Sequence, residues 1–266
     1  MIRIKIKEME TCERRVVLRM PFRFGVITLT EEPELFLRVR IETEAGGSSW
    51  GAAAEALAPK WFDKNPALSN EDNFEQLRTS LKIAASVYRS EDRLETPFRL
   101  SAYRYETIRQ LGLSKGLNLL VSGFGPAIID RAVLDAVCRI QQVGFVDALR
   151  ENLPGLELTP FLPELTHFDW KAFLSSRVRA DSVHARHTVG LVDPIRTCDI
   201  APADRINDGL PESLEEVART YRNVYYKLKL SGEIEADLER LQEIAKVLDD
   251  LDWKYRVTLD GNEQYR

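Results

Sequence analysis

The first part of the chain alternates apolar and charged positions. Basic residues separate Ile2, Ile4 and Ile6. Arginines likewise separate Leu37, Val39 and Ile41. A period of two with one polar face predicts strands of an antiparallel sheet that is covered on one side only. We therefore expect about the first 45 residues to form such a sheet.

Helical spacing of apolar residues replaces this alternation further along the chain. It extends over residues 72–88 and again over 126–149, where a wide apolar stripe must be buried. Residues 152–181 are rich in proline and aromatic residues, which predicts a connection with a short helix. These patterns predict one N-terminal domain, residues 1–182, built from an antiparallel sheet and helices.

The pattern changes again after about residue 183. Short apolar segments at 188–192, 224–230 and 255–259 alternate with helical patterns at 211–221 and 233–251. This alternation predicts right-handed βαβ units and a parallel sheet. Residues 183–266 suffice for about three βα units of about 30 residues each. A closed (β/α) barrel has eight strands, so we expect an incomplete barrel here.

Composition narrows the classes of function. The chain has 266 residues, of which 44% are hydrophobic, and its 37 basic and 42 acidic residues give a net charge of −5. This balance argues against a nucleic-acid surface, and no apolar stretch approaches the ~20 residues of a membrane span. The three cysteines are few and far apart, which favours a reducing, cytoplasmic location.

Two lysines stand at the end of the segment that finishes at Leu230. Side chains alternate across a strand, so Tyr225, Lys227 and Lys229 share one face. Two cations inside a sheet are unfavourable unless they line a wet or charged cavity. Their proximity favours the neutral form of one of them, which suits a general base. The alternative is an edge strand with solvated lysines.

A carboxylate ends the next predicted strand. Asp260 shares a face with Thr258 and Asn262 and is followed by Gly261, an arrangement that suits a hard cation such as Mg²⁺. The alternative is a simple turn, since Asp-Gly-Asn is also turn chemistry. Lys229 and Asp260 are about one βα repeat apart, so both strand ends should meet at the same rim, with a candidate base beside a candidate metal ligand.

These residues resemble a known family. Lys-x-Lys at the end of one strand, followed one βα unit later by Asp-x-Asn-Glu, resembles the enolase superfamily, and most closely its mandelate racemase and muconate lactonizing enzyme branch. The helix with Ala132–Val137 is similar to the helix that closes that family's capping domain, although Cys138 and Arg139 stand where the family often has Trp and Asp. The resemblance implies an α+β capping domain, residues 1–182, followed by a partial (β/α) TIM-type barrel, residues 183–266, that ends after about three strands.

The resemblance also implies residue roles. Lys229 would be the base that removes a proton α to a carboxylate, and Lys227 would tune its pKa and stabilise charge. Asp260 would be the first Mg²⁺ ligand, with Asn262 supporting it. The implied activity is that of a racemase, epimerase, cycloisomerase or dehydratase that acts on a small carboxylate substrate.

The capping-domain loops of that family shape substrate specificity. The corresponding stretches are 21–27 and 48–55, whose aromatic residues are candidates for the pocket lining: Phe22, Phe24 and Trp50. The alternative is that these aromatic residues only pack the capping domain.

The ligands that would complete the site are missing from the sequence. The family's second and third carboxylate ligands and its opposing acid/base residue lie on later strands, and one carboxylate cannot hold Mg²⁺ tightly. A three-stranded partial barrel also leaves an open edge. We therefore expect the chain alone to be inactive and poorly stable, to associate as a homo-oligomer, or to be a portion of a longer protein. A second hypothesis is a non-catalytic remnant or binding module in which the capping domain is the useful part.

Overall fold

The chain folds into two compact units. The computed structural model describes residues 1–90 and 92–265. The first unit comprises Met1–Val16 and Glu32–Arg179, and the second comprises Val17–Glu31 and Ala180–Arg266. The sequence led us to expect a division after residue 182. The structure differs in that residues 17–31, the tip of a long hairpin, pack with the second unit.

The first unit is built on an antiparallel sheet. Its three strands follow the order β1 (Ile4–Phe24), β2 (Ile27–Thr43) and β3 (Ser48–Ala56). β2 and β3 pair in antiparallel register, with Arg40 opposite Trp50. The expectation of a loop over 48–55 was wrong, because this Ala- and Gly-rich stretch is a strand. It carries little β propensity of its own, and the pairing with β2 determines its conformation.

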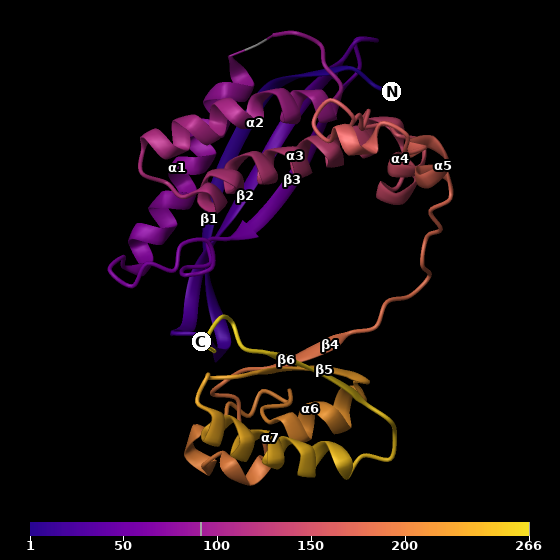
Figure 1. The fold of residues 1–266 in the computed structure, drawn as a ribbon. Coiled ribbons are helices and arrows are strands. Elements are labelled where there is room, and N and C mark those ends of the chain that lie inside the picture. Colours follow the sequence, from indigo (N-terminus) through magenta and orange to yellow (C-terminus); the bar gives the residue numbers. More distant parts are fainter. Residues whose placement is uncertain (91, 266) are drawn as a thin grey trace. The chain divides into compact units, whose positions relative to one another are not determined.

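Helices cover one face of this sheet (Figure 1). They are α1 (Asn70–Arg89), α2 (Pro97–Ser114) and α3 (Leu119–Gln141), followed by the short helices α4 (Phe145–Arg150) and α5 (Trp170–Ser175). The single helix predicted over 126–149 is therefore two helices. The first ends because Gln142 adopts a left-handed conformation, with φ of 54°, which cannot continue an α-helix. Pro126 lies inside α3 rather than at its start.

Close contact between β3 and α3 requires a glycine. The alternating apolar side chains of β2, from Leu37 to Ile41, are fully buried in the same core. A Cβ added at Gly51 would lie only 2.2 Å from both the carbonyl oxygen of Ala132 and the backbone nitrogen of Ala136. Atoms at that separation overlap strongly, so α3 can approach β3 only where the strand carries no side chain.

We expect Gly51→Ala to destabilise the first unit by about 3 kcal/mol, because the added methyl group meets backbone atoms that cannot rotate away. Gly123→Ala is the matched control: Gly123 lies in α3, the helix that packs against Gly51, and its added Cβ would meet nothing within 4 Å. This control should stabilise the helix by about 0.5–1 kcal/mol. Urea unfolding followed by circular dichroism measures both values, and equal effects of the two substitutions would contradict the packing argument.

The second unit contains a parallel sheet, as the alternation predicted. Strands β4 (Arg186–Val189), β5 (Tyr225–Lys229) and β6 (Arg256–Asp260) lie in the order β4-β5-β6, and both pairings are parallel. Helices α6 (Leu214–Tyr221) and α7 (Ile234–Asp249) connect them on one face (Figure 1). Tyr226 and Leu228 pack against these helices, which leaves the alternate residues of β5 on the opposite face.

Short 3₁₀ helices complete the structure at Pro163–Leu165, Thr197–Asp199 and Pro202–Asp204. Within the described residues, each helix is too short or too polar to span a bilayer.

Candidate active site

Lys229 ends the central strand of the parallel sheet. β5 lies between β4 and β6, so the alternative of an edge strand with solvated lysines is wrong. Lys229 is only 3% exposed, and the register places it directly opposite Asp260 on β6. A buried ammonium group needs partners that replace its lost hydration.

Two oxygen atoms supply those partners. The Nζ of Lys229 donates to Asp260 Oδ2 at 2.8 Å and to Asn262 Oδ1 at 2.5 Å. Lys227 lies on the same face, and its Nζ is 3.4 Å from the same Asp260 oxygen. The structure therefore brings together all four residues that the sequence singled out at this rim, although their catalytic and metal-binding roles remain predictions.

The lysines stabilise the ionised form of Asp260. The hydrogen bond from Lys229 holds the pKa of the Asp260 carboxyl below its usual range. Partial burial opposes this shift, while the charge of Lys229, the backbone N–H of Asn262 and the Lys227 ammonium add to it. Asn262 has φ of 45°, and its N–H donates to Asp260 Oδ1 at 3.2 Å. Asp260 therefore begins a turn, as the alternative predicted, and also accepts a hydrogen bond from Lys229.

Asp237 links the loops that follow β5 and β6, a role that the sequence did not predict. Asp237, in the first turn of α7, is 4% exposed and accepts hydrogen bonds from Ser231, Gly232 and Tyr265. Burial favours its neutral form, but the hydrogen bonds outweigh burial and hold the pKa of Asp237 below its usual value. The available signal was an acidic residue in the first turn of a helix that follows a Ser-Gly pair.

The tip of the β1–β2 hairpin contributes aromatic side chains to the same unit. The Phe24 ring centroid is 5.7 Å from Lys229 Nζ, and the Phe22 ring is 5.7 Å from that of Phe24. Phe24 is buried with Ile27 and Leu29. Phe24 thus contacts the candidate base directly, whereas Trp50 lies on β3 of the first unit, where the Arg38 guanidinium covers its ring at 4.6 Å.

The residues at this rim do not by themselves form a magnesium site. Asp260 Oδ2 already bonds the ammonium group of Lys229 and lies beside that of Lys227. Asp260 is therefore already engaged by two ammonium groups, and one carboxylate alone cannot hold Mg²⁺ tightly. Across residues 1–90 and 92–265, no group of three or more His, Cys, Asp or Glu side chains is arranged to hold a metal ion.

Several solved structures share the fold of this chain. The chain matches a dipeptide epimerase from Methylococcus capsulatus, complexed with Mg and the dipeptide L-Arg-D-Lys, with 19% identity and a TM-score of 0.52. It matches an enolase from Bradyrhizobium, complexed with magnesium and mandelic acid, with 13% identity and a TM-score of 0.57. It also matches the L-Ala-D/L-Glu epimerase from Bacillus subtilis, with 17% identity and a TM-score of 0.54. The chain has the fold of the enolase superfamily.

These matches extend over 98% of this chain but only 55% of each of those three chains. The chain therefore spans about half the length of the enolase-superfamily structures that it matches. Its antiparallel sheet with helices corresponds to a capping domain, and its parallel sheet to part of a (β/α) barrel, so the predicted fold class is confirmed. At the level of sequence, neither a family model nor a curated protein matches the chain.

Proposed function

We propose that the rim of the second unit supplies the base of an enolase-superfamily enzyme that removes a proton α to a carboxylate. The observation that carries this proposal is Lys229, a buried lysine at the end of the central strand with its Nζ held between Asp260 and Asn262. The matched epimerases and the enolase bound to mandelic acid support the reaction class.

This geometry supports the following proton transfer. Lys229, in its uncharged form, takes the α-proton: the C–H bond breaks, an N–H bond forms, and the electron pair moves onto the α-carbon and the substrate carboxylate. The resulting ammonium is the species that Asp260 and Asn262 are placed to hold. Lys227 presents a second positive charge beside it, which attracts the anionic substrate and stabilises the charge that develops.

Two of the matched structures are complexed with magnesium, and Asp260 is the residue of this rim that we propose to bind such an ion. Such an ion would need further oxygen ligands from substrate, water or other protein segments. For this reason we assign the outcome of the reaction, whether racemisation, epimerisation, cycloisomerisation or dehydration, to groups beyond these residues. Phe22 and Phe24 are the proposed specificity residues of the hairpin tip.

The test is exchange of substrate α-protons in deuterated water. The protein purified from its native source, supplied with Mg²⁺ and a panel of dipeptides and 2-hydroxy acids, should replace the α-proton by deuterium, as measured by ¹H NMR. We expect slow exchange by the 266-residue chain alone, because Asp260 is the one carboxylate among the four residues placed at this rim. Absence of exchange by the native-source protein with every substrate would overturn the proposal.

A further inference from the structure

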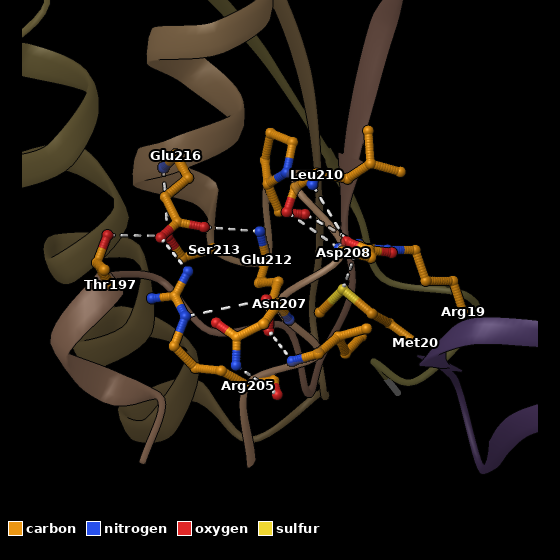
Figure 2. A network of polar contacts seen from close by, with 12 residues as sticks. Arg19, Met20, Thr197, Arg205, Asn207, Asp208, Leu210, Glu212, Ser213 and Glu216 are labelled. Atoms are coloured by element: carbon orange, nitrogen blue, oxygen red, sulfur yellow. Dashed lines mark hydrogen bonds and ion pairs between the residues drawn. The ribbon is translucent and has the colours of Figure 1, made fainter. Parts of the chain in front are cut away.

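A single arginine on the hairpin tip is bonded to the loop that precedes α6. Arg19 lies on β1 and belongs to the second unit, together with residues 205–212. Figure 2 shows the Arg19 side chain reaching Asp208, with the side chains of Arg205, Glu212 and Glu216 to the left of Asp208 in this view. These contacts join residues that are 189 positions apart in the chain.

All the hydrogen-bond donors of the Arg19 guanidinium are used. Nε and Nη2 donate to the two carboxylate oxygens of Asp208, each at 2.6 Å. Nη2 and Nη1 also donate to the backbone carbonyls of Leu210 and Pro211, each at 3.0 Å, and Nη1 contacts the Met20 sulfur at 3.4 Å. Only the planar fork of arginine can make this set of contacts, because lysine has three donors on a single atom.

The receiving loop is itself held in one shape. The buried carboxylate of Glu212 accepts from the backbone N–H groups of Ile206 and Asn207, at 3.0 and 3.1 Å. Arg205 pairs with Glu216 on α6 at 2.7 Å, and the Asp208 carboxylate also accepts from the Leu210 N–H at 3.1 Å. Arg19 consequently docks on a preformed acceptor rather than on a loop that it must first order.

Other contacts connect the docked tip with the candidate base. The Leu191 N–H, just after β4, donates to the Arg23 carbonyl at 3.2 Å, and the Phe24 ring lies over the Lys229 ammonium. The hairpin tip therefore reaches Lys229 through Phe24, while its own position is secured by Arg19.

From these contacts we infer that Arg19 is a positioning residue: its bonds to Asp208, Leu210 and Pro211 fix the hairpin tip so that Phe24 covers Lys229. The docking of the tip does not depend on the proposed function. Only its effect on substrate choice rests on that function. Loss of the Arg19 bonds releases the tip and uncovers the lysine, while the parallel sheet beneath keeps its fold.

Hydrogen–deuterium exchange of the full chain tests the docking. In Arg19→Ala, amides of residues 22–29 should exchange about tenfold faster than in the wild type, because charge-assisted and bidentate bonds are lost. The exchange of β5 should not change. Arg19→Lys should give an intermediate value. Arg219→Ala is the matched control, since Arg219 makes its ion pair within α6, and it should leave the tip unchanged.

A second measurement separates positioning from general stability. The ε-methylene protons of Lys229 should show a ring-current shift from Phe24 in the NMR spectrum, assigned by its disappearance in Lys229→Met. This shift should collapse in Arg19→Ala, persist in Arg219→Ala and return in part when Arg19→Asp is combined with Asp208→Arg. Unchanged tip exchange together with an unchanged Lys229 shift in Arg19→Ala would overturn the inference. Neither readout requires turnover, so failure of the proposed function would not be mistaken for failure of the docking.

Discussion

Replacing Lys229 with methionine is expected to reduce α-proton exchange by about 10³-fold, because the reaction then lacks its base. Methionine preserves most of the length and packing of the buried side chain but cannot accept a proton. The measurement is the rate at which the protein incorporates deuterium into a substrate that undergoes exchange, at saturating concentrations of substrate and magnesium.

Lys227→Met is the informative comparison. Lys227 shares the strand face but is more exposed, with 23% of its side chain accessible. If it only attracts and stabilises negative charge, its loss should lower the exchange rate by about 10- to 100-fold. A Lys229→Met variant that retains wild-type exchange would exclude Lys229 as the base and would direct attention to Lys227.

Replacing Asp260 with alanine is expected to destabilise the second unit by about 3 kcal/mol, because it leaves the buried Lys229 ammonium without its anionic partner. Asn262 still accepts one hydrogen bond, but an amide oxygen cannot balance a full charge. Urea unfolding, followed through the amide exchange of β5 peptides, reports on this unit separately from the first.

The double variant Lys229→Met with Asp260→Ala provides the control. Removing both members of a buried ion pair is often close to neutral. Adding Lys229→Met should therefore restore most of the stability lost in Asp260→Ala. Lys227→Ala should cost less than about 1 kcal/mol, as expected for a more exposed partner. If Asp260→Ala were as mild as Lys227→Ala, Lys229 would not depend on Asp260.

The parallel sheet and its rim could be predicted because their signals are local. Alternation along β5 separates Lys227 and Lys229 from Tyr226 and Leu228, and one βα repeat then fixes which strand end lies beside Lys229. Asp260 follows from that spacing alone. The enolase-superfamily fold could be recognised from the same segment, since strand-end residues are what such folds use for chemistry.

Other parts of the structure depend on contacts that no local pattern encodes. β3 was missed because its small residues form a strand only beside β2, with Gly51 fitted against α3. α2 was missed although Thr96 and Pro97 carry a helix-start signal, since its charged residues obscure the apolar spacing. Asp237 carried a sequence signal, an acidic residue in the first turn after a Ser-Gly pair, but its partners and those of Arg19 become apparent only once the loops are in place.

The long hairpin affects how the chain folds during its synthesis. Residues 17–31 leave the ribosome early, yet Asp208, the partner of Arg19, is encoded 189 positions later. At about 5–20 residues per second, the tip waits roughly 10–40 s for its docking loop. Phe24, Ile27 and Leu29, which are buried in the finished unit, remain uncovered during that interval. Translation speed and chaperone access should therefore influence the yield of this chain more strongly than its final stability suggests.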